Sequence, residues 1–200
     1  MKEHYYDKLL NIKTTGDQQG FHNSMHYHRY EPTPYSALEK LFEEYELQSG
    51  DQVVDFGCGK GRLNFYMNHV FHIRATGIEM DAELYEAALK NKERYLKKHP
   101  IGRGKVEFRQ CLAEDYKIDR KDNRFYFFNP FSVQVFMKVI NNILKSVEKA
   151  QREVDVVLYY PSEDYIYFLQ NETAFQLVQE VELHGFSNPR EKFAIHRLSY

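Results

Sequence analysis

The stretch Val53–Met67, "VVDFGCGKGRLNFYM", carries the strongest structural signal in the chain. An apolar, β-branched run ends at Gly57, Gly59 and Gly61, and a helical pattern of apolar residues begins at once. Glycine tolerates positive φ and lets the backbone approach a ligand, and the free N–H groups of the following helix point to the same place. The stretch therefore predicts a strand, a ligand-binding loop and a helix in an open α/β sheet, whose ligands bind at the carboxyl ends of the strands.

The spacing of these glycines argues against a dinucleotide. A G-x-G-x-x-G fingerprint would need its third glycine at position 62, which is Arg62. Asp55, just before the loop, would repel a pyrophosphate and would suit a ligand that carries an amino group. Glu79 ends the next apolar run, about where a carboxylate that accepts both ribose hydroxyls should lie. The pattern favours an adenosine ligand with an amino group and disfavours a nicotinamide-dependent oxidoreductase.

The chain from about residue 51 alternates between β-rich runs and helical patterns. The clearest helix follows Ser132, where apolar residues recur at three- and four-residue steps up to Val147. Such alternation, with right-handed crossovers, builds a parallel sheet covered on both faces, and a short turn joins the last two runs as an antiparallel hairpin. The predicted fold is therefore α/β: a doubly wound, mostly parallel seven-stranded sheet with helices on both faces and an antiparallel C-terminal hairpin strand. The expected strands are 51–57, 71–79, 105–110, 124–129, 153–160, 175–183 and 192–199.

The glycine stretch together with "GIEMD" (Gly77–Asp81) closely resembles the class I S-adenosylmethionine-dependent methyltransferases. The element order is similar to theirs, so the resemblance covers about residues 30–200. It implies S-adenosyl-L-methionine as cofactor, with Asp55 near the methionine amino group and the glycine loop around the methionine part. It further implies that Glu79 holds the ribose hydroxyls and that Met80 packs on the adenine.

One departure from the family follows the third expected strand. Many relatives have Gly-Asp-Ala there, with the Asp touching the adenine amino group, whereas this chain has Cys111, Leu112 and Ala113. The resemblance implies that backbone groups of Leu112 and Ala113 still face the adenine. Glu114 or Asp115 is expected to replace the missing side-chain contact.

The segment "RYEPTPYSALEKLF" (Arg29–Phe42) adds a second resemblance, to a stretch that enters a helix in some lysine and adenine N-methyltransferases. In those enzymes the element closes over the cofactor, which implies that Thr33 reaches the methionine carboxylate and that Tyr30 contacts the cofactor. The alternative is a proline-initiated helix with Thr33 as its N-cap, and the two are compatible. Residues 1–33 are predicted to form an N-terminal lid or cap, and residues 34–200 the methyltransferase domain.

The stretch "RFYFFNPFS" ends in Asn129 and Pro130, which match the first half of the Asn-Pro-Pro-aromatic tetrapeptide of amino and amide N-methyltransferases. Phe131 and Ser132 replace its second half. The resemblance implies that Asn129 lies beside the cofactor's methyl group and accepts a hydrogen bond from the target nitrogen, with Pro130 beside it and Phe131 as an aromatic surface. The alternative is a turn that ends a buried strand, with Ser132 as N-cap of the next helix.

Two polar segments have several interpretations. His22, His26 and His28 lie close together, but no cysteine or acid completes a known ligand spacing, so no metal is predicted. An exposed lid, or a substrate contact or proton shuttle near the methyl group, is favoured for these histidines. Aromatic faces can stabilise the sulfonium or a cationic amine, and the candidates are Tyr27, Tyr30, Phe131 and Tyr160. The basic run Lys90–Lys105 is either a solvated helix face or a substrate-facing basic edge.

Composition bounds the remaining possibilities. With 42% apolar and 28% charged residues and a net charge of -2, the chain is typical of one soluble domain and gives no global case for a nucleic-acid partner. No segment has the apolar core of a signal peptide or the length to span a bilayer, and Cys58 and Cys111 are too few for a disulfide framework. A reduced, cytoplasmic protein without a membrane partner is expected.

The predicted function is that of an S-adenosylmethionine-dependent N-methyltransferase acting on a protein side chain or a nucleic-acid base. A small-molecule methyltransferase and a catalytically silent cofactor-binding subunit are the alternatives. Asn129 separates the last of these, because a silent subunit has no need of an acceptor at that strand end. Nothing in the sequence indicates the oligomeric state.

Overall fold

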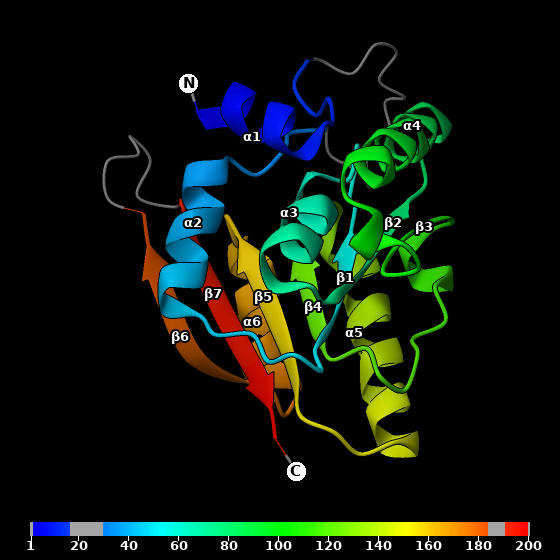
Figure 1. Ribbon diagram of the computed structural model, residues 1–200. Coiled ribbons are helices and arrows are strands. Elements are labelled where there is room, and N and C mark those ends of the chain that lie inside the picture. The colour runs from blue at the N-terminus through cyan, green and yellow to red at the C-terminus, as the bar shows by residue number, and fades with distance from the viewer. Residues whose placement is uncertain (1, 17–29, 184–190, 200) are drawn as a thin grey trace.

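The computed structural model describes residues 2–16, 30–183 and 191–199. Its centre is a seven-stranded sheet with the order β3-β2-β1-β4-β5-β7-β6 (Figure 1). β3, β2, β1, β4 and β5 are parallel, and β7 pairs antiparallel with both β5 and β6. The predicted fold class is confirmed. The strands are β1 (Gln52–Phe56), β2 (Arg74–Glu79), β3 (Val106–Gln110), β4 (Arg124–Phe127), β5 (Val154–Tyr159), β6 (Gln176–Glu182) and β7 (Lys192–Leu198).

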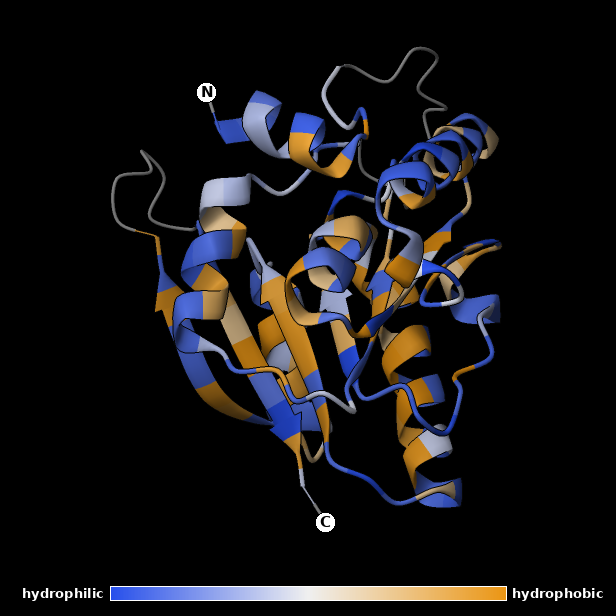
Figure 2. Cartoon of the chain, viewed as in Figure 1, coloured by the Kyte–Doolittle hydropathy of each residue, from blue (hydrophilic) through white to orange (hydrophobic). Residues whose placement is uncertain are grey.

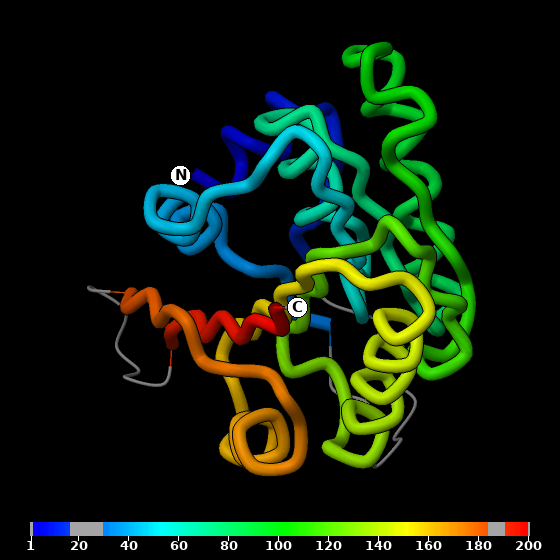
Figure 3. The backbone as a smooth tube through the Cα atoms, turned by 90° about the horizontal axis from the view of Figure 1, so that it is seen from below, coloured from blue at the N-terminus to red at the C-terminus, as the bar shows by residue number. Residues whose placement is uncertain are grey.

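Helices cover both faces of the sheet. Seen from below in Figure 3, α5 and α6 lie on one side, and α2, α3 and α4 lie on the other. None of the helices in the described ranges has the length and hydropathy that a bilayer crossing needs. The helices are α1 (Lys2–Leu10), α2 (Tyr35–Glu44), α3 (Arg62–Phe71), α4 (Ala82–Lys98), α5 (Val133–Lys149) and α6 (Glu163–Glu172).

One helix end explains a difference from the predicted elements, and another confirms a predicted N-cap. β2 begins at Arg74 rather than at Phe71, because Phe71 still belongs to α3 and His72 ends that helix with a φ of +57°. Asp81 caps α4 as the pattern predicts, since its side chain accepts a hydrogen bond from the backbone N–H of Leu84.

The alternation of side chains along the strands divides the core into two layers. In β1, Val53 packs on the face of α2 and α3, whereas Val54 and Phe56 pack on the face of α5. The apolar stripe predicted for α5 is buried from Val135 to Val147. Figure 2 shows hydrophobic residues gathered on the central strands and hydrophilic residues spread over α4.

The two ends of the sheet differ in chemistry. At the amino ends of the parallel strands, the buried carboxylate of Asp155 accepts hydrogen bonds from Tyr45 and, at 2.8 and 2.9 Å, from Arg197. At the carboxyl ends lie the loops that follow β1, β2 and β4, and α1 lies across the molecule at this end (Figure 1). This second end carries the glycine loop, Glu79 and Asn129, which the sequence singles out.

Candidate functional site

The glycine loop between β1 and α3 has no room for a side chain at any of its three glycines, Gly57, Gly59 and Gly61. A Cβ built on Gly57, whose φ is +78°, would lie 2.7 Å from the Cβ of Pro130. One built on Gly59, whose φ is +53°, would lie 2.1 Å from the ring of Tyr30. The loop is fastened to β2, because the N–H groups of Gly57 and Cys58 donate to the carbonyl of Ile78. The structure therefore places the loop, Pro130 and Tyr30 against one another.

Two buried carboxylates flank this loop. Oε2 of Glu79 accepts from the N–H of Gly59 and Oε1 from that of Asp81, each at 2.9 Å. Asn64, with its amide nitrogen turned to Asp55, donates to Oδ2 at 3.1 Å. Burial raises the pKa of Glu79, and burial followed by the nearby Glu79 raises the pKa of Asp55 well above its ordinary value. A cationic ligand would stabilise the charged form of both groups.

Exposed apolar side chains stand at the next two strand ends. Met80 directly follows β2 and is 39% exposed, and Leu112 follows β3 and is also 39% exposed. Ala113, beside it, is buried. Two apolar side chains at adjacent strand ends offer a surface for a flat ring such as adenine. Glu114, expected as a substitute contact, has its carboxylate 3.4 Å from Lys138 of α5.

The ends of β4 and β5 carry backbone strain. Asn129 follows β4 with a φ of +38°, and Tyr160 follows the adjacent β5 with a φ of +51°. Residues other than glycine rarely adopt such values, and they concentrate at functional sites. Because Pro130 lies against Gly57, the preceding Asn129 is held close to the glycine loop. Its position beside a methyl group stays a prediction.

Phe131 lies elsewhere. Its ring is only 2% exposed and meets Phe127 edge to face in the core on the α5 side. Its carbonyl accepts a hydrogen bond of 2.5 Å from the hydroxyl of Tyr165. The structure thus gives Phe131 a packing role and does not expose the aromatic surface expected of it. Ser132 occupies the N-cap position of α5.

Tyr30 and Thr33 approach the site from the N-terminal side. The hydroxyl of Thr33 hydrogen-bonds to that of Tyr126 at 2.8 Å, and Tyr126 is the cross-strand neighbour of Asp55. The ring of Tyr30 covers Gly59, with the ammonium of Lys60 at 5.0 Å from its centre. The N-cap alternative for Thr33 is wrong, because Pro34 holds that position.

Three residues of the site are not indicated by the sequence patterns: Arg62, Asn64 and Tyr126. Arg62 draws attention only as the residue that breaks the dinucleotide spacing, yet it is 4% exposed and hydrogen-bonded to the N-terminal segment. Two polar residues in the first turn of an otherwise apolar helix are an unusual pattern, and this pattern could have indicated Arg62 and Asn64. Tyr126 lies within an aromatic run that reads as core.

Some predictions fall outside the described residues, namely those for His22, His26, Tyr27 and His28. Within residues 2–16, 30–183 and 191–199, no group of three or more His, Cys, Asp or Glu side chains is arranged to hold a metal ion.

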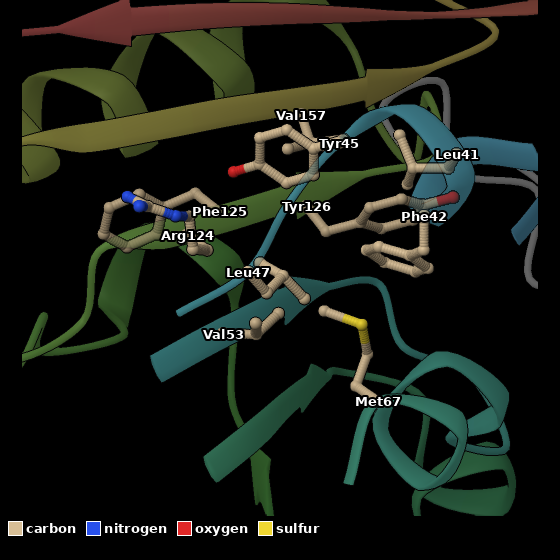
Figure 4. Close-up of a pocket in the computed structure, with 10 residues that line it drawn as sticks. All are labelled: Leu41, Phe42, Tyr45, Leu47, Val53, Met67, Arg124, Phe125, Tyr126 and Val157. Carbon is tan, nitrogen blue, oxygen red and sulfur yellow. The ribbon is translucent and has the colours of Figure 1, made fainter. Parts of the chain in front are cut away.

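A small cavity lies away from the glycine loop, between α2 and the sheet (Figure 4). Leu41, Phe42, Val53 and Met67 contribute to its walls, and so does Tyr126. The lining is largely apolar, and the hydroxyls of Tyr45 and Tyr126 are already hydrogen-bonded to Asp155 and Thr33, so we assign the cavity to the packing of α2.

Residues 33–125 match the family model described as a methyltransferase domain. The seven-stranded sheet with its antiparallel β5-β7-β6 end is the class I methyltransferase fold, so the resemblance to class I S-adenosylmethionine-dependent methyltransferases is confirmed. The buried carboxylates, the glycine loop and the apolar pair Met80 and Leu112 fit that cofactor.

The sequence relatives match over short stretches. A protein-lysine N-methyltransferase of Saccharolobus islandicus is 33% identical over 66 residues, which are 32% of this chain and 41% of that protein. A ribosomal protein L11 methyltransferase of Burkholderia mallei is 40% identical over 63 residues, which are 32% of this chain and 20% of that protein. The chain thus covers less than half of the length of either relative.

Solved structures show the same fold over most of the chain. A putative RNA methyltransferase from Pyrococcus horikoshii has a TM-score of 0.61 and 17% identity, with 100% of this chain and 98% of that chain covered. An RNA methyltransferase from Salinibacter ruber, in complex with S-adenosyl-L-homocysteine, has a TM-score of 0.55 and 20% identity, with 84% of this chain and 92% of that chain covered. At these identities the likeness concerns the fold.

Proposed function

We propose that this protein is an S-adenosylmethionine-dependent N-methyltransferase. The observation that carries the proposal is the meeting of two features at one sheet edge. Asp55 and Glu79, both buried, flank the glycine loop, and the strained Asn129 stands against the same loop through the contact of Pro130 with Gly57. The first feature suits a cationic adenosine cofactor, and the second supplies a hydrogen-bond acceptor for an amine or amide nitrogen.

Each side chain has a defined task in this scheme. When bound, the cofactor supplies a methyl group on a sulfonium, which is already a good leaving group. Glu79 would hold the ribose hydroxyls and Asp55 the amino group. The side-chain carbonyl of Asn129 would accept from an N–H of the target, so that the nitrogen lone pair points to the methyl. Orientation of this kind supplies several kcal/mol of the barrier reduction in general.

Asn129→Ala tests the assigned role. Transfer of labelled methyl groups to the macromolecules of a cell extract is expected to fall at least a hundredfold, while affinity for S-adenosylhomocysteine stays within about threefold, because only the target nitrogen loses its acceptor. Asn171→Ala is the matched control, since Asn171 is exposed at the end of α6. Parental transfer by Asn129→Ala would make Asn129 a strand-ending residue without a catalytic role.

A basic surface favours a nucleic-acid base over a protein side chain as the target. Asn11 donates to the carbonyl of Arg94 and Lys98 donates to that of Lys8, so the segment after α1 lies along α4. The amide of Asn91 bonds to both Lys13 and Lys60, which extends the surface toward the glycine loop. The exposed cations of this basic strip are Lys8, Lys13, Lys90, Arg94, Lys97 and Lys98, with Glu86 and Glu93 as exposed acids among them.

Such a strip fits the phosphates of a nucleic acid, whose binding weakens as salt rises. Treating the labelled extract with nuclease or with protease separates the two substrate classes. Arg94→Glu is expected to weaken RNA binding at least fivefold at low salt, with Lys145→Glu on α5 as the control. Label that survives nuclease and disappears with protease would assign the enzyme to proteins.

A further inference from the structure

Arg62, the first residue of α3, is a buried cation with partners from three other segments. Its Nε donates to the hydroxyl of Thr14 at 2.8 Å, and one terminal nitrogen donates to the carbonyl of Thr33 at 3.1 Å. The same nitrogen pairs with the carboxylate of Glu3 on α1. The guanidinium lies over the ring of Tyr35 at 4.5 Å. Because an arginine cannot shed its charge, these contacts are what make its burial tolerable.

The residues around Arg62 form a closed polar network. Asp7 of α1 accepts from both the N–H and the hydroxyl of Thr14, each at 2.7 Å, and from the hydroxyl of Tyr35 at 2.9 Å. Asp7, Thr14 and Arg62 are all less than 10% exposed. The N-terminal segment is thus fastened to the start of α3 by directed hydrogen bonds rather than by apolar contact alone.

Two chains of contacts lead from Arg62 to the cofactor site. In the first, Thr14 accepts through its carbonyl from the hydroxyl of Tyr30 at 2.8 Å, and the ring of Tyr30 covers Gly59. In the second, Arg62 holds the carbonyl of Thr33, whose hydroxyl bonds to Tyr126 beside Asp55. Tyr30 and Thr33 are the two N-terminal residues expected to touch the cofactor, and Arg62 bonds directly to one and through Thr14 to the other.

We propose that Arg62 is a positioning residue that couples the docking of residues 2–16 to cofactor binding. The proposal rests on the proposed function, because it takes the glycine loop to be the cofactor site. Arg62 acts through Thr14 and Thr33 without touching the reacting atoms. By linkage, the cofactor then stabilises the docked N-terminal segment as much as the docked segment stabilises the bound cofactor.

Calorimetric titration with S-adenosylhomocysteine tests the coupling. Arg62→Met is expected to weaken binding at least tenfold, and Arg62→Lys to recover part of the loss, because lysine keeps the charge without the planar fork. Arg74→Met is the control, since Arg74 is 44% exposed and pairs with Glu107. In turnover assays Arg62→Met should raise the KM for the cofactor and leave kcat within about twofold.

Hydrogen exchange supplies a readout that a merely structural role would not move. S-adenosylhomocysteine is expected to increase the protection of residues 2–16 in the parent and in Arg74→Met, and to have no such effect in Arg62→Met. Thr14→Val, a milder change to the same network, should weaken binding and should not add to the effect of Arg62→Met. It also keeps the test valid if Arg62→Met fails to fold.

The outcomes separate the two proposals. If the folded parent does not bind S-adenosylhomocysteine, the proposed function fails. If the parent binds and both Arg62→Met and Thr14→Val bind equally well, the proposed function stands and the role of Arg62 is overturned. Parental ligand-induced protection of residues 2–16 in Arg62→Met would also overturn it.

Discussion

Asp55 is the residue at which burial and charge conflict most strongly in the site. It lies at the end of β1 with a pKa raised by burial and by Glu79, and the amide of Asn64, with its nitrogen turned to Asp55, donates a hydrogen bond to it. A carboxylate in such surroundings gains from a cation, and under the proposed function that cation is the methionine amino group. The cost of burying two acids at one edge is therefore understandable as preparation for a ligand.

At this scale the sequence can indicate residues that lie together because they are near in the chain or end neighbouring strands. Gly57, Gly59 and Glu79 are such residues, and the structure places them together, since Glu79 accepts from the N–H of Gly59. Their roles toward a cofactor stay predictions. Arg62 is different, since its partner Glu3 lies 59 positions away and only the docking of α1 brings them together. No local pattern records such a contact.

His196, in the middle of β7, gives a prediction about pH. It is fully buried, and neither ring nitrogen has a hydrogen-bond partner among the described residues. Burial lowers its pKa from 6.5 to about 4. Below pH 6.5 the unfolded chain therefore takes up a proton that the folded protein does not accept until about pH 4. Stability should fall through this window by roughly 3 kcal/mol on account of this residue.

Urea unfolding of His196→Leu between pH 7 and pH 4.5 tests that sign. The variant should lose clearly less stability than the parent as the pH decreases. His4→Leu, which removes an exposed histidine from α1, should follow the parent. An acid-induced loss in His196→Leu as large as in the parent would refute the assignment.

At the scale of elements, the strands were predictable because each is a short apolar run bounded by polar turns. The position of the last two strands in the sheet is set by tertiary contacts, because β7 lies between β5 and β6. The order along the chain does not indicate it. The predicted start of β2 at Phe71 was wrong, because this apolar residue belongs to the last turn of α3. Helix α1 lies in the segment expected to form a lid, and the lid function itself stays a prediction.

The junction of α2, β5 and β7 supports a prediction about stability. Asp155 is fully buried and hydrogen-bonded to Tyr45 and Arg197. Asp155→Ala would therefore leave the partly buried guanidinium of Arg197 and the buried hydroxyl of Tyr45 without this partner. A loss of about 3–5 kcal/mol in the free energy of unfolding is expected. Glu153→Ala removes a 44% exposed partner of the same arginine and should cost under about 1 kcal/mol.

Denaturant titrations of the two variants compare these costs directly. Cofactor affinity should be unchanged in both once they are folded, because Asp155 lies at the opposite end of the sheet from the glycine loop. Equal losses of stability in Asp155→Ala and Glu153→Ala would contradict the view that this carboxylate organises the junction.

In the whole molecule, the two ends of the sheet have different roles. Ion pairs and buried hydroxyls fasten the amino ends of the strands, while the carboxyl ends carry the glycine loop, two buried acids and a strained asparagine. Hydrogen bonds and an ion pair of Arg62 fasten the N-terminal segment to the start of α3 at this second end. The fold class followed from periodicity, whereas this docking did not, because it depends on side chains far apart in the sequence.

The central claim is that the glycine-loop edge binds an S-adenosylmethionine-type cofactor. Isothermal titration calorimetry of the folded protein with S-adenosylhomocysteine tests it most directly, with NAD as the competing ligand and Gly57→Arg as the variant that blocks the loop. We predict one site per chain for S-adenosylhomocysteine, no heat with NAD, and no binding by Gly57→Arg. Binding of NAD without S-adenosylhomocysteine, or parental affinity in Gly57→Arg, would contradict the account.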